Sequence, residues 1–142
     1  MERRDFIRLS VAGVSAGVVA PVMALAKSDL QVKAASDIYY TKDNPGRWSG
    51  KVATHLPDIK IEKTGAKITV NVTTAHEMKA YEHYIVKHVL LDQNYKFMDE
   101  KLFDPTKDKA AISQFTLQGY SGPIYVLSMC NKHDLWLNGS EV

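Results

Sequence analysis

Short segments of alternating apolar and polar residues recur over residues 58–130 and restrict the possible folds more than any other feature of the sequence. Because a strand places successive side chains on opposite faces, this period of two predicts strands with one buried face. The first such segment alternates on both sides of residues 63–65, which predicts a β-hairpin over 58–72. Further strands are expected within 82–93, 110–118 and 122–130. Short strands without an amphipathic helix predict an all-β fold, an immunoglobulin-like antiparallel β-sandwich.

The N-terminus carries the pattern of an export signal. Arg3 and Arg4 precede an uncharged stretch over residues 9–26, which ends in the small residues that a signal peptidase cleaves after. The arginine pair predicts a twin-arginine signal peptide over 1–26, followed by one domain over 27–142. The twin-arginine machinery would export this domain, already folded, to the bacterial periplasm. The alternative is a retained membrane anchor, for which a stretch rich in Gly and Ala is short.

The charge balance argues against one class of partner. Without the first 26 residues the chain keeps 15 of its 18 basic residues and 14 of its 16 acidic residues, a net charge near +1. A nucleic-acid-binding domain usually shows a concentrated basic face, which this sequence lacks. No nucleic-acid partner is therefore expected.

Cys130 is the only cysteine, so the chain cannot form an intramolecular disulfide. In the periplasm a reactive free thiol would be oxidised or would pair with another molecule. The thiol is therefore expected to be buried or occupied. A metal bound before export would occupy it.

The five histidines divide into two groups by their place in the predicted fold. His88 lies within a strand and faces away from His83, so it is left out of any site. The other four lie in loops or at strand ends, where side chains can converge with the thiol of the Cys-x-x-His step. Imidazole and thiolate ligands suit iron, copper, zinc or nickel, and five ligands exceed a tetrahedral zinc site. The candidate metal ligands are His55, His76, His83, Cys130 and His133.

Three short motifs resemble those of the superoxide reductase family, which comprises neelaredoxin and the iron-binding domain of desulfoferrodoxin. The segment CNKHDLW at 130–136 resembles that family's C-N-x-H-G-L-W signature. AHEMKAYEHYI at 75–85 and THLP at 54–57 resemble two further motifs, in the family's order. The resemblance covers residues 48–136. It implies a mononuclear non-haem iron, Fe2+/Fe3+, with four equatorial imidazoles from His55, His76, His83 and His133.

The resemblance also implies a function. Cys130 would be the axial thiolate, and Cys130 and His133 would be the catalytic residues of a superoxide reductase. Such an enzyme reduces superoxide to hydrogen peroxide and takes its electron from an external donor. In the periplasm a c-type cytochrome fits this role better than a rubredoxin-like carrier. A homo-oligomer is compatible with the sequence.

This chain departs from the family pattern near three of the ligands. Ala53 and Thr54 stand where the family has Glu-Lys before the first histidine, a pair that caps the open site and attracts superoxide. Glu77 replaces a proline, Asp134 replaces a glycine, and the interval from His76 to His83 is one residue longer. The lysines that could substitute for the missing one are Lys51, Lys79 and Lys132.

Two other functions are compatible with a β-sandwich of this composition. A cupredoxin-like electron carrier would bind copper through two histidines, a cysteine and a methionine soon after the last histidine. The sequence after His133 contains no methionine, and Met129 precedes the cysteine. A non-catalytic binding module with a vestigial site is the other alternative, which the missing Glu-Lys pair supports.

Overall fold

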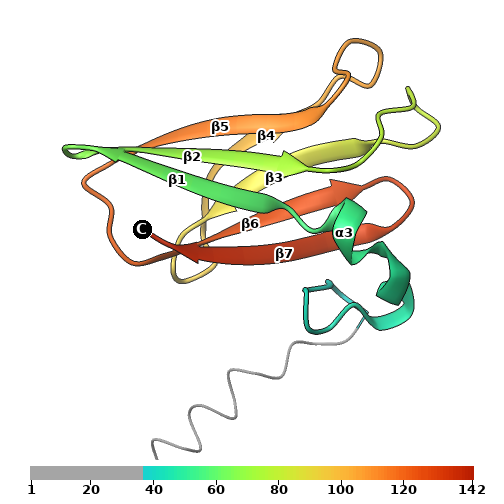
Figure 1. Ribbon diagram of the computed structural model, residues 1–142, viewed down its shortest axis with the longest axis horizontal. Helices are drawn as coiled ribbons and strands as arrows, with labels where there is room; N and C mark the ends of the chain where they lie inside the picture. The colour runs from blue at the N-terminus through green and yellow to red at the C-terminus, as the bar shows by residue number, and fades with distance from the viewer. Residues whose placement is uncertain (1–36) are drawn as a thin grey trace, which may run out of the picture. The chain divides into compact units, whose positions relative to one another are not determined.

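The computed structural model describes residues 37–142, which form two antiparallel sheets (Figure 1). One sheet has the order β1-β2-β5 and the other has the order β4-β3-β6-β7. The strands are β1 (Asp58–Thr64), β2 (Lys67–Thr74), β3 (Ile85–Leu91), β4 (Phe97–Leu102), β5 (Ala111–Gln118), β6 (Pro123–Cys130) and β7 (Asp134–Glu141). The predicted all-β, immunoglobulin-like sandwich is confirmed.

The signal peptide expected over 1–26 lies outside the described residues, as do residues 27–36. Over 37–142 the structure contains no helix that is long and apolar enough to cross a membrane. The helical elements there are the 3-10 helix η1 (Gly46–Lys51) and the single turn α3 (Val52–His55). Both precede the first strand.

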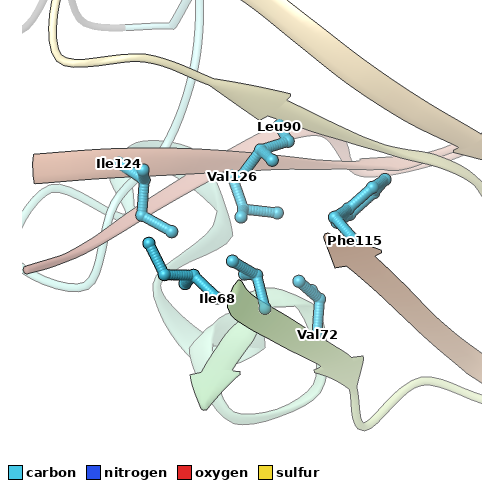
Figure 2. Close-up of a cluster of buried hydrophobic side chains, with 7 residues drawn as sticks. Ile68, Val72, Leu90, Phe115, Ile124 and Val126 are labelled. Atoms are coloured by element: carbon cyan, nitrogen blue, oxygen red, sulfur yellow. The ribbon is translucent and has the colours of Figure 1, made fainter. Parts of the chain in front are cut away.

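The core between the sheets comes from the alternation of the strands. In β2, Ile68, Val70 and Val72 are buried, while the residues between them are more exposed. They pack against apolar side chains from β3, β5 and β6, as Figure 2 shows. Removing one such side chain from water stabilises the fold by roughly 1.5–3 kcal/mol. The remaining members of this cluster are Leu90, Phe115, Ile124 and Val126.

The predicted hairpin is confirmed, with its turn slightly later than expected. β1 and β2 pair in register up to Thr64 and Lys67, so the turn consists of Gly65 and Ala66. Gly65 has a φ of +62°, a left-handed conformation that glycine adopts without steric cost. This glycine allows both strands to continue to the end of the sandwich.

Two strands were not predicted from the sequence. β4 is an edge strand whose sequence, FMDEKL, does not alternate between apolar and polar residues. Its apolar residues Phe97 and Leu102 are largely exposed. β7 contains Asn138 and Gly139, residues that are uncommon in strands. Both strands form because they pair along their length with a buried neighbour, β3 or β6.

His88 lies in the core between the two sheets. Its ring nitrogens lie 2.9 Å from Thr74 Oγ1 and 2.7 Å from Ser113 Oγ, and Thr74 Oγ1 lies 2.9 Å from Ser128 Oγ. Each polar atom of this buried group therefore has a partner. Burial lowers the pKa of His88 to about 4, so the ring is neutral near pH 7.

The His88 environment predicts a pH dependence of stability. Between pH 6.5, the ordinary pKa of histidine, and pH 4, the unfolded chain binds a proton at His88 that the folded chain does not. The free energy of unfolding should therefore decrease as the pH falls through this window, by on the order of 3 kcal/mol. His88→Gln keeps a hydrogen-bonding side chain but does not titrate. The free energy of unfolding of this variant should therefore decrease less between pH 6.5 and 4 than that of the wild type. Urea unfolding of both metal-free proteins between pH 7 and 4 measures the difference, and parallel curves would contradict it.

Candidate metal centre

Five potential ligands come together from α3 and from the connections and strand ends around β2, β3, β6 and β7. Figure 1 shows α3 beside one end of the sandwich. One ligand atom from each residue can be chosen so that all five atoms lie within 4.8 Å of one another. His55 ends α3, and His76 follows the end of β2. The other three are His83 before β3, Cys130 at the end of β6, and His133 in the turn between β6 and β7. The structure thus brings together every residue of the candidate set.

The ring nitrogens of the four histidines form a square. His133 Nδ1 lies 3.1 Å from Nε2 of both His55 and His83, and His83 Nε2 lies 3.0 Å from His76 Nε2. The His55 and His76 rings close the square with centroids 4.6 Å apart, whereas those of His55 and His83, across the diagonal, are 6.2 Å apart. A square of this size has corners about 2.2 Å from its centre, close to a metal–imidazole bond length.

The sulfur of Cys130 lies on one side of this square. Its Sγ is 3.6 Å from His76 Nε2 and 3.5 Å from His133 Nδ1, which are diagonally opposite nitrogens. Four imidazole nitrogens and one sulfur that converge on a common point suit a first-row transition metal. Five donors are one more than a tetrahedral structural zinc site uses. The donor set therefore fits a mononuclear iron, copper or nickel better than a structural zinc.

Hydrogen bonds behind the rings orient two of the inner nitrogens. His55 Nδ1 lies 2.8 Å from Thr54 Oγ1 and 3.1 Å from the carbonyl of Lys51, which both accept from it, and His76 Nδ1 donates to the carbonyl of Glu77. A ring that donates through Nδ1 presents the lone pair of Nε2 to the centre. His83 Nδ1 lies 3.5 Å from a carboxylate oxygen of Glu77, so all three rings turn Nε2 inward.

Burial favours the neutral form of three of the clustered histidines. It lowers the pKa of His55 to about 4, and it also lowers the pKa of His76 and of His133. The neighbouring imidazoles lower these pKa values further, because like charges would repel one another. Neutral imidazoles are available as ligands at pH 7.

Burial has the opposite effect on the thiol. It raises the pKa of Cys130, although the backbone N–H of Lys132 donates to Sγ at 3.4 Å and lowers the pKa in part. A thiol that binds a metal cation is deprotonated because the ion's charge outweighs the cost of burial. The thiolate form of Cys130 thus depends on the bound metal.

A hollow lies beside three of the four histidines. Its lining includes His55, His76 and His83 but not Cys130. Lys51, Thr54, Ala75 and Glu77 complete its walls. A small molecule in this hollow would therefore lie against three of the four imidazoles.

The lysines suggested by the sequence differ in their positions. Lys51 lines the hollow and its charge lowers the pKa of His133. Lys79 pairs with Glu77 at 3.4 Å, and Lys132 lies in the turn between Cys130 and His133. Of these three, Lys51 is the one at the opening.

Two sequence-based descriptions of the histidines are corrected by the structure. His55 was expected in a loop, but it ends α3, a single turn too short to give an amphipathic pattern. His83 was expected at the start of the strand within 82–93, but β3 begins at Ile85, and His83 precedes it in an isolated bridge with Lys79. His88 lies outside the cluster in the core, as expected.

Asn131 holds the turn that carries His83, a role that the sequence analysis missed. Its side chain donates to the carbonyls of Tyr81 and Glu82 and accepts from the backbone N–H of Tyr84 at 3.0 Å. The signal in the sequence was the position of an asparagine directly after Cys130. Asn131 thereby links the Cys130 end of β6 to the loop of another ligand.

A family model described as Desulfoferrodoxin matches residues 47–139. Among solved structures, a superoxide reductase (neelaredoxin) from Ignicoccus hospitalis is 26% identical with a TM-score of 0.63, covering 78% of this chain and 98% of that chain. A superoxide reductase in the oxidised state is 26% identical with a TM-score of 0.60, covering 77% and 99%. A superoxide reductase from Nanoarchaeum equitans, 19% identical with a TM-score of 0.58 and covering 73% and 99%, shares the fold. No curated protein sequence matches this chain.

Replacing the thiol should remove its spectroscopic signature. We expect the iron-loaded protein to show a thiolate-to-iron charge-transfer band, and Cys130→Ser to abolish it while the fold persists. His88→Gln, a change to a histidine outside the cluster, should leave both the band and the iron content near wild type. Absorption spectra and metal analysis of the three proteins test the assignment. Iron loss in His88→Gln with a retained band in Cys130→Ser would contradict it.

Proposed function

The chain belongs to the desulfoferrodoxin family, and we propose that it is a superoxide reductase. The reaction is O₂•⁻ + e⁻ + 2 H⁺ → H₂O₂. The observation that carries this proposal is the convergence of four imidazoles and one thiol beside an open hollow. The superoxide reductase structures at 26% identity support the same activity.

The five clustered residues, His55, His76, His83, Cys130 and His133, would hold a mononuclear non-haem iron. When bound, iron supplies the electron that reduces superoxide and alternates between Fe2+ and Fe3+. Cys130 would contribute a thiolate, whose negative charge would favour electron donation by the metal. Burial favours the neutral form of His55, His76 and His133, so these three ligands would add no charge to the site.

The hollow suits a small anionic substrate. Lys51 places a positive charge beside the imidazoles, and the Thr54 hydroxyl lines the same wall. A cation at the mouth of a site raises the local concentration of an anion and its rate of association. Lys51 would thus do part of the work of the lysine that the family carries directly before its first histidine.

The geometry favours this function over a cupredoxin-like carrier. A blue-copper site uses two histidines, one cysteine and a weak axial methionine. Here four imidazoles surround the centre, and each contributes a nitrogen to the square. A hollow that leads to the ligands is also unnecessary for a carrier that exchanges electrons only.

The predicted export signal suggests where the enzyme acts. We propose that the twin-arginine machinery delivers the folded domain to the periplasm after cleavage near residue 26. The electron donor would then be a periplasmic carrier, for which a c-type cytochrome is the candidate class. Arg3, Arg4 and the uncharged stretch after them support this proposal.

Removing the charge at the hollow should slow the reaction with superoxide. We expect Lys51→Gln to lower the second-order rate constant by about 3- to 10-fold, because the anion is no longer attracted to the opening. The effect should diminish as added salt screens the charge. Pulse radiolysis of the reduced, iron-loaded protein measures this rate.

Two matched variants complete this test. Thr54→Lys adds a second cation at the same wall and should raise the rate constant and its salt dependence. Lys87→Gln removes a lysine on β3 that pairs with Glu100, and should change neither. If superoxide fails to oxidise the iron in all of these proteins, the centre has another purpose.

The mature N-terminus can be determined directly. Mass spectrometry of protein isolated from the periplasm of the native bacterium should give a chain that begins at or near Lys27. Changing Arg3 and Arg4 to Lys should retain the precursor in the cytoplasm. An intact N-terminus on protein found in the cytoplasm would contradict the export proposal.

A further inference from the structure

Asp134 has an unusual backbone conformation beside a ligand. It directly follows His133, begins β7 and has a φ of +64°. Side chains with a Cβ seldom adopt this left-handed conformation, although aspartate tolerates it better than most. A glycine would adopt it without strain, so the carboxylate at this position requires another explanation.

The carboxylate of Asp134 joins two side chains from η1. Its Oδ2 accepts from Trp48 Nε1 at 2.9 Å and from Arg47 Nη2 at 2.7 Å. These bonds hold the pKa of Asp134 below its ordinary value, with the bond from the Trp48 indole as the largest cause. The turn that carries His133 is thereby fastened to a segment 86 residues earlier in the chain.

The same contacts reach the rings of the metal centre. The Trp48 indole meets the His133 imidazole edge-on, with centroids 4.7 Å apart. The Arg47 guanidinium lies over the Trp48 ring, 4.7 Å from its centroid. Trp48 has non-helical backbone angles within η1, where two helical pieces meet at a kink. The indole of Trp48 thus packs against the His133 ring and limits its orientation.

The fastened segment also carries a ligand of its own. η1 continues into α3, which ends at His55, and the Lys51 carbonyl between them accepts from His55 Nδ1. The other four candidate ligands lie between residues 76 and 133. Contacts around Asp134 therefore connect the segment that supplies His55 with the turn that supplies Cys130 and His133.

We propose that Asp134 is a positioning residue for the metal centre, which docks η1 and α3 and sets the plane of the His133 ring through Trp48. The inference rests on the metal site of the proposed function and is independent of superoxide as the substrate. If Asp134 were only a partner in an exposed ion pair, it would contribute little, as exposed pairs usually do. Metal affinity distinguishes the two roles.

The test measures Co2+ affinity by competition with a chelator, and the visible spectrum of the Co2+ form. We expect Asp134→Gly to weaken binding by about 10-fold or more, the range typical of groups that orient ligands, and to alter the spectrum. The loss should occur without loss of thermal stability of the metal-free protein, because glycine relieves the backbone. Asp134→Asn, whose amide oxygen can still accept from Trp48, should show a smaller loss and keeps the test valid if the glycine variant does not fold.

Two further variants complete the comparison. Trp48→Phe lacks the indole N–H and so breaks the same hydrogen bond as Asp134→Gly. The effects of the two changes on Co2+ affinity should therefore not add in the double variant. Glu100→Gln breaks another exposed ion pair, with Lys87, and should leave the affinity unchanged. Wild-type affinity and spectrum in Asp134→Gly, or additive effects in the double variant, would overturn the proposal. A wild-type protein that binds Co2+ and iron but does not react with superoxide would refute only the proposed function.

Discussion

The convergence of five ligand atoms within 4.8 Å is the constraint on which the functional end of this protein depends. Burial there favours the uncharged forms of His55, His76 and His133, whose pKa values it lowers, and of the Cys130 thiol, whose pKa it raises. A bound cation offsets the cost of burial, because every lone pair then faces a positive charge. The sandwich brings these atoms together from the end of β6, from α3 and from the connections around β2, β3 and β7.

The sites of His88 and of the clustered histidines show two solutions to histidine burial. His88 is enclosed between the sheets, where the hydroxyls of Thr74 and Ser113 satisfy both ring nitrogens. His55 has a backbone partner for Nδ1 only, while its Nε2 faces the other imidazoles. His88 thus connects the two sheets, whereas His55 keeps the lone pair of Nε2 available to bind a metal.

Charge is distributed unevenly around the centre. Lys51 and Glu77 both line the hollow, and the Glu77 carboxylate lies 3.4 Å from Lys79 Nζ and 3.5 Å from His83 Nδ1. Asp134 lies next to His133 and is paired with Arg47. The carboxylates of Glu77 and Asp134 are thus paired with cations, while Lys51 adds a positive charge to the lining of the hollow. This distribution of charge suits the approach of a small anion.

The sequence by itself determined the all-β class, the hairpin over 58–72 and the identity of the five clustered residues, because alternation and short motifs are local properties of a chain. It did not reveal β4 and β7, whose exposed or strand-poor residues form strands only beside β3 and β6. Only the tertiary structure decided which lysine lines the hollow and which partner Asp134 meets 86 residues away. Those contacts depend on how distant segments pack, and no periodicity along the chain encodes that packing.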